Sequence, residues 1–97
     1  MAKNERDVVV EACAVIIHEY VRASDMFPPF NSAHEGYAVI LEELDELKAE
    51  VWKNPASRDA AKLIKEAVHV AAMALRFIVD LCPFEIAEVR TPAPPEE

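Results

Sequence analysis

Prolines divide this chain into three long segments, and their spacing limits the folds that it can adopt. Pro28 and Pro29 follow the first segment, Pro55 follows the second and Pro83 the third. A proline ends a helix because it lacks an N–H donor and its ring clashes with the preceding turn. The single glycine, Gly36, lies inside a helical pattern, which argues against folds with many tight turns and against a glycine-rich phosphate loop.

Each segment between prolines repeats its apolar residues at helical spacing, and no strand pattern competes. The spacing predicts helices over residues 4–23, 32–53 and 57–81. Asn4 and Ser57 are the expected N-caps of the first and third helices, and Ser32 with Glu35 forms a capping box for the second. The expected fold is all-α, a bundle of three main helices, with one further turn possible after Phe84.

The small size of the chain bears on how it completes its core. Its 97 residues allow one helical domain over residues 1–90, followed by a flexible proline-rich tail over 91–97. A chain of this length buries only about two-thirds of its unfolded surface, so we expect homo-oligomerisation to complete the bundle. Cys13 and Cys82 lie in apolar stretches, where buried single thiols are expected. Met26, Phe27 and Phe30 are expected to close one end of the bundle, and Trp52 to pack.

Charge and hydropathy exclude two classes of partner. The formal net charge is −8 at pH 7, and an acidic chain repels the phosphate backbone of nucleic acids. No apolar run approaches the roughly 18 residues of a membrane span, and the charged start of the chain lacks a signal-peptide core. These features predict a cytoplasmic protein without nucleic-acid or membrane partners.

The most informative residues are the acidic ones of the second helix: Glu42, Glu43, Asp45, Glu46 and Glu50. At helical spacing Glu43, Glu46 and Glu50 form a stripe that borders the apolar face. Like charges at this spacing destabilise a helix, and a bound cation would remove that cost. Carboxylates suit Mg²⁺ or Mn²⁺. The alternative is an acidic face that is simply solvated.

The third helix carries a matching pair, Glu66 and His69, one turn apart on the same face. If the two helices pack antiparallel, this pair lies near Glu43 and Glu46. Lys62, Lys65 and Arg76 lie beside the pair and are candidates for contacts with a phosphate group, or else solvated side chains. His69 could instead be a structural residue. No serine or cysteine has a suitable base nearby, so nucleophilic catalysis has no support.

This pattern resembles the EExxE…ExxD signature of the MazG-like, all-α nucleoside triphosphate pyrophosphohydrolases. Here the motif reads Glu42-Glu43-x-x-Glu46, then 19 intervening residues, then Glu66-x-x-His69. Residues 27–47 and 67–77 are similar to a small bacterial and phage subgroup of that family. The resemblance implies a bundle completed by dimerisation, Mg²⁺ as cofactor, and cleavage of nucleoside triphosphates to monophosphate and pyrophosphate. It also implies that Glu43, Glu46 and Glu66 are metal ligands, with Glu42 beside them.

His69 departs from the family pattern, because it stands where the family has aspartate. An imidazole nitrogen is a poor ligand for Mg²⁺ and a better one for Mn²⁺, Fe²⁺, Co²⁺ or Zn²⁺. Three consequences are possible: another carboxylate such as Glu50 or Asp80 replaces the aspartate, His69 contacts phosphate instead of metal, or activity is weak or lost.

Two other classes of function fit the same residues. Glu-x-x-His is half of the ligand set of a ferritin-like di-metal carboxylate protein, which a homodimer would complete. The chain could also be a non-enzymatic dimeric interaction protein, or a degenerate family member that binds nucleotide without cleaving it. Metal dependence of stability and of pyrophosphate release separates these classes.

Overall fold

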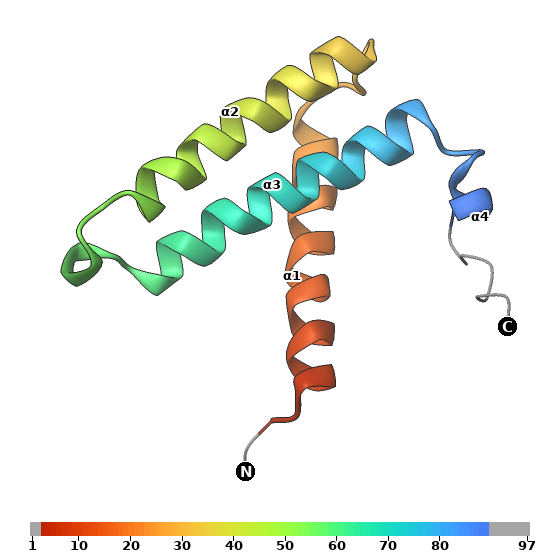
Figure 1. Ribbon diagram of the computed structural model, residues 1–97. Helices are drawn as coiled ribbons and strands as arrows, with labels where there is room; N and C mark the ends of the chain where they lie inside the picture. The colour runs from red at the N-terminus through yellow and green to blue at the C-terminus, as the bar shows by residue number, and fades with distance from the viewer. Residues whose placement is uncertain (1–2, 90–97) are drawn as a thin grey trace, which may run out of the picture.

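A computed structural model describes residues 3–89, and every regular element in that range is helical. The elements are α1 (Glu5–Met26), α2 (Ala33–Val51), the 3₁₀ turn η1 (Pro55–Ser57), α3 (Ala60–Leu81) and α4 (Ile86–Val89). Helices α2 and α3 form an antiparallel hairpin, and α1 crosses it (Figure 1). The prediction of three main helices and one later turn is confirmed. The predicted tail over 91–97 lies outside the described residues.

Local capping explains where the helices begin. Asn4 Oδ1 accepts from the backbone N–H of Asp7 at 2.9 Å, and Ser32 Oγ accepts from that of Glu35 at 3.1 Å, as predicted. The cap of α3 is Asp59 rather than Ser57, because residues 55–57 form the 3₁₀ turn and the helix begins after it. Asp59 Oδ1 accepts from Ala61 N at 2.9 Å.

A small core joins the three helices where α1 crosses the hairpin. Ala23, Phe30, Ala72 and Met73 are buried, with six partly buried neighbours: Ile16, Tyr20, Val39, Ile40, Phe77 and Leu81. Gly36 is buried where α2 meets α3, and a Cβ atom there would lie 2.6 Å from Phe77 Cδ2. The absence of that Cβ permits the close approach of α2 and α3 at this point.

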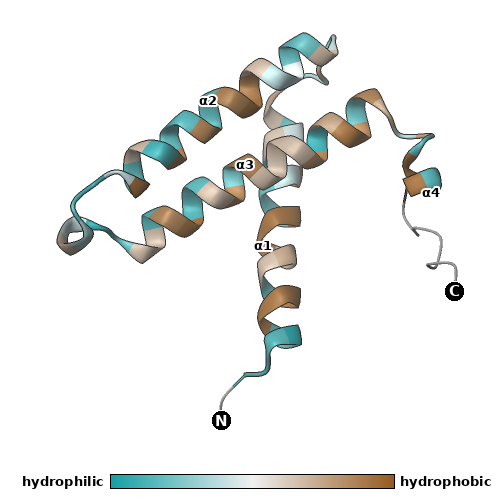
Figure 2. Cartoon of the chain, in the orientation of Figure 1, coloured by the Kyte–Doolittle hydropathy of each residue, from teal (hydrophilic) through white to brown (hydrophobic). Residues whose placement is uncertain are grey.

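Both cysteines, which we expected to be buried, are exposed in the chain by itself. Cys13 and Cys82 are free and exposed, and the apolar residues Val8 and Val15 on α1 are each about half exposed. Figures 1 and 2 show why these residues of α1 are exposed. The N-terminal half of α1 carries hydrophobic residues beyond the edge of the hairpin, and no helix within residues 3–89 covers them.

The exposure of Met26, Phe27 and Trp52 also differs from what we expected. Of the three residues predicted to close the bundle, only Phe30 is buried, whereas Met26 and Phe27 are more than half exposed. Trp52 is 73% exposed, with the Lys48 ammonium 5.7 Å from its ring centroid, so the prediction that it packs in a core is wrong for the single chain. None of the helices in the described part has the length and apolar character needed to cross a membrane.

Candidate metal centre

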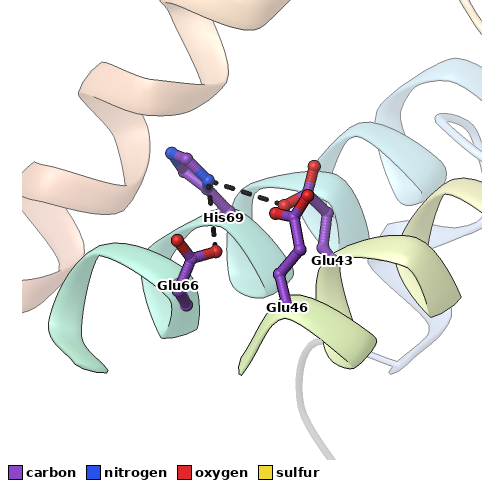
Figure 3. Close-up of side chains that lie close together, drawn as sticks. All are labelled: Glu43, Glu46, Glu66 and His69. Atoms are coloured by element: carbon purple, nitrogen blue, oxygen red, sulfur yellow. Dashed lines mark ion pairs between the residues drawn. The ribbon is translucent and has the colours of Figure 1, made fainter. Parts of the chain in front are cut away.

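The structure brings together the four residues that the sequence analysis named as metal ligands. Glu43 and Glu46 come from α2, and Glu66 and His69 come from α3 (Figure 3). Each offers one ligand atom, and the four atoms all lie within 4.8 Å of one another. The antiparallel hairpin causes this, because residues one helical turn apart on α2 face residues one turn apart on α3.

Two carboxylate oxygens in this cluster are buried without a partner. Glu43 Oε2 and Glu66 Oε2 accept no hydrogen bond from the part of the chain that the structure describes. His69 Nδ1 lies 3.5 Å from the first and 3.9 Å from the second. Ligand atoms about 2.1 Å from a common metal ion lie roughly 3.0–3.5 Å apart when adjacent and about 4.2 Å apart when opposite. The two distances from His69 Nδ1 therefore lie within a few tenths of an ångström of those between ligands of one metal ion.

The carboxylates of the cluster repel one another. Burial raises the pKa of the Glu43 carboxyl above its ordinary value, and the neighbouring charge of Glu46 raises it further. The charge of His69, when protonated, acts in the opposite direction. The protein thus holds the Glu43 carboxylate in a position where its charged form is disfavoured, and a nearby cation would offset that cost.

A fifth residue of the site, Glu19, was missed by the sequence analysis. Its Oε2 lies 3.7 Å from His69 Nε2, on the side of the imidazole away from Glu43 and Glu66. Arg22 donates to both Glu19 oxygens, from Nε at 2.8 Å and from Nη2 at 2.6 Å. These hydrogen bonds lower the pKa of the Glu19 carboxyl. Its position one turn from both Ile16 and Ala23, which contact the core, was the available signal that it faces the hairpin.

A cavity of about 390 Å³ adjoins the cluster. Its lining includes Glu42, Glu43 and His69 of the cluster region. The other lining residues come from α1, the α1–α2 connection, α2 and α3: Glu19, Arg22, Ala23, Phe27, Pro28, Phe30, Glu35, Val39, Met73 and Arg76. It therefore combines carboxylates, two arginines and aromatic rings in a single recess. A second recess, about 620 Å³ and almost wholly apolar, lies between α2 and α3 around Tyr37 and Phe77.

Arg76 supports the wall of the first cavity. It is buried, and its Nη2 donates to the carbonyl oxygen of Pro28 at 2.8 Å. Its guanidinium lies 4.6 Å from the centroid of the Phe30 ring, and Asp80 Oδ2 accepts from Phe30 N at 3.1 Å. Arg76 and Asp80 thus tie the α1–α2 connection to α3.

The remaining candidate residues lie outside the cluster. Lys62 and Lys65 are exposed on α3, and neither is among the residues that line the cavity. Glu42 is exposed at the cavity rim. Glu50 and Asp80, suggested as replacements for the missing aspartate, are not among the four clustered residues. Glu50 pairs with Lys53 at 2.9 Å, and Asp80 accepts a hydrogen bond from Phe30 N.

Comparisons with known proteins matched no family model, no curated protein and no solved structure. The resemblance to the MazG-like family therefore rests on the motif residues and their spacing.

Proposed function

We propose that the chain is a divalent-metal-dependent nucleoside triphosphate pyrophosphohydrolase that releases a nucleoside monophosphate and pyrophosphate. The observation that supports this most is the pair of buried, unpartnered oxygens of Glu43 and Glu66 facing His69 Nδ1 beside a cavity. An acidic recess holds a polyanion only through cations, so metal-bound phosphates are the ligand class that fits both features.

In this proposal Glu43, Glu46, Glu66 and His69 hold Mg²⁺ or Mn²⁺. When bound, the metal would neutralise charge on the phosphates and on the leaving pyrophosphate. Glu42, which is exposed and lines the cavity, would orient or deprotonate the attacking water. Arg22 and Arg76 line the same cavity. Because Arg76 already donates to Pro28 O, its contribution is to hold the wall against which the nucleotide would lie.

A pyrophosphate-release assay over ribo- and deoxynucleoside triphosphates, with Mg²⁺ and Mn²⁺ in parallel, tests the activity. Glu46→Gln and Glu66→Gln are expected to abolish metal-dependent release while the helix content is unchanged. Glu50→Gln is the matched control, because Glu50 lies on the same helix but pairs with Lys53, and it should retain the wild-type rate. Wild-type rates in both Glu46→Gln and Glu66→Gln would show that the assigned site is wrong.

His69 favours one other function, a metal-carboxylate protein that does not hydrolyse nucleotides. An imidazole beside carboxylates suits iron or manganese better than magnesium. Tight binding of Mn²⁺ or Fe²⁺ without pyrophosphate release from any nucleotide would support this alternative.

We also propose that the protein self-associates, because the single chain exposes more surface than a folded monomer of its size. Its accessible surface is 7771 Å², whereas about 5,500 Å² is typical for its mass. If a full unfolded share of about 1,600 Å² is subtracted for the ten residues outside the described range, about 6,200 Å² is left for residues 3–89. About 5,100 Å² is typical for the mass of those residues alone, so roughly 1,100 Å² of excess remains. An interface area counts the surface buried on both partners, so a dimer that covered this excess would bury about 2,200–4,400 Å² in total. That area falls within the range of obligate homodimer interfaces.

The exposed apolar residues indicate which surfaces a second copy would cover. One group lies on α1 before its last turns: Val8, Val9, Val10, Val15 and Ile17. A second group lies on the hairpin, where Tyr37 and Ile78 line the apolar recess and Leu41 and Leu44 follow Tyr37 along α2. Analytical ultracentrifugation is expected to give a dimer or a dimer of dimers at micromolar concentration. A stably folded monomer at that concentration would contradict self-association.

A further inference from the structure

The two nitrogens of His69 face different groups. Nδ1 lies 3.5 Å from Glu43 Oε2 and 3.9 Å from Glu66 Oε2, whereas Nε2 lies 3.7 Å from Glu19 Oε2. The imidazole is only 22% exposed. It therefore lies between the hairpin carboxylates on one side and a carboxylate of α1 on the other.

This arrangement matches the way in which proteins orient a metal-binding histidine. A histidine that binds a metal through one nitrogen usually donates its other N–H to a carboxylate, a backbone carbonyl or water, which fixes the tautomer and the ring orientation. Glu19 is itself 14% exposed, and Arg22 holds both of its oxygens. The 3.7 Å separation is longer than a hydrogen bond, and a shift of less than 1 Å would close it.

We propose that Glu19 is a positioning residue that holds His69 as an Nδ1 ligand of the metal centre, so that the centre selects Mn²⁺ or Fe²⁺ over Mg²⁺. This inference rests on the proposed metal site. It adds α1 to a site otherwise built on the hairpin. It also gives a role to His69, which stands where the MazG-like signature has aspartate. A nitrogen ligand shifts the metal preference of a site from Mg²⁺ toward transition metals.

The wild-type protein allows a direct test, with Zn²⁺ as a diamagnetic probe. Long-range ¹H–¹⁵N NMR correlations of ¹⁵N-histidine-labelled protein distinguish a metal-bound nitrogen from a protonated one. The expected result on adding Zn²⁺ is that His69 Nδ1 becomes metal-bound and Nε2 carries the proton. Metal bound at Nε2, or an unchanged His69 spectrum while Zn²⁺ binds elsewhere in the cluster, would overturn the proposal.

Two variants separate orientation by Glu19 from general effects of the Glu19–Arg22 pair. Glu19→Gln is expected to weaken Mn²⁺ binding about 10- to 100-fold, as measured by calorimetry, and to reduce the preference for Mn²⁺ over Mg²⁺. Arg22→Gln removes the hydrogen bonds that hold Glu19 but keeps the carboxylate, so it should weaken Mn²⁺ binding less than Glu19→Gln does. Equal losses in both variants would mean that the ion pair acts only through local structure.

The outcomes also distinguish this proposal from the proposed function. Tight Mn²⁺ binding that is unaffected by Glu19→Gln would overturn the role of Glu19 and leave the metal site standing. No binding of Mn²⁺, Zn²⁺ or Mg²⁺ by the wild-type protein would overturn both.

Discussion

Replacing Gly36 with alanine tests the close approach of α2 and α3 that brings the halves of the candidate metal centre together. Alanine in a helix interior is favoured over glycine by about 1 kcal/mol, so an unhindered site would gain stability. The new Cβ would lie 2.6 Å from Phe77 Cδ2 and 3.2 Å from Phe30 Cδ2. Because both rings pack in the core, neither moves freely.

The structure therefore predicts a net loss. Forcing an extra carbon into a packed core costs about 1–3 kcal/mol, and the upper part of this range applies where two rings enclose the atom. After the propensity gain, we expect Gly36→Ala to lower the unfolding free energy by about 1–2 kcal/mol. For a domain of this size that corresponds to a decrease in Tm of roughly 4–16 °C.

Thermal unfolding followed by circular dichroism at fixed protein concentration measures this effect. Ala38→Gly, at an exposed position on the same helix, measures the propensity term alone. In a Phe77→Leu background the shortest contact is lost and the 3.2 Å approach to Phe30 remains, so the loss of stability caused by Gly36→Ala should be smaller. An increase in Tm for Gly36→Ala in the otherwise wild-type protein would refute the close packing of Gly36 against Phe77.

Three further predictions follow from the site. Mn²⁺ at 100 times its Kd should stabilise the protein by about 2.7 kcal/mol, or roughly 10–20 °C in Tm, and Glu66→Gln should remove this gain; an unchanged wild-type Tm would count against a metal site. In metal-free protein the raised pKa of Glu43 means that the folded state binds a proton more tightly than the unfolded state, so stability falls as the pH rises from 4.5 through the raised pKa. The Tm advantage of Glu43→Gln over wild type should grow across that window, and a pH-independent difference would contradict the burial of a charged Glu43. Arg76→Gln should cost about 1.5–3 kcal/mol in urea unfolding, because the charged bond to Pro28 O is lost; an unchanged midpoint would show that Arg76 does not hold the α1–α2 connection.

Those features of the fold that depend on short stretches of sequence were predictable. The prolines and the caps at Asn4 and Ser32 act within a few residues, so they locate helices without knowledge of the rest of the chain. The meeting of Glu43 and Glu46 with Glu66 and His69 was also predictable. Helical spacing fixes each pair, and a short connection makes the helices antiparallel neighbours.

Features that depend on how α1 lies across the hairpin were not predictable in the same way. Glu19 joins the site only because α1 crosses α3 near His69. Helical spacing along α1 marks an apolar face but does not say what covers it, which is why Cys13 was expected to be buried and is exposed. The cap at Asp59 was missed because the 3₁₀ turn before it has no strong signal in the sequence.

We propose above all that the acidic cluster supports cleavage of a nucleoside triphosphate between its α and β phosphates. Phosphorus-31 NMR of a triphosphate incubated with the protein and Mn²⁺ observes the bond that breaks. We expect the resonances of pyrophosphate and nucleoside monophosphate to increase together and to report equal molar amounts of the two products. Neither resonance should appear with Glu66→Gln. Formation of nucleoside diphosphate and orthophosphate, or no change in any triphosphate with either Mn²⁺ or Mg²⁺, would contradict it.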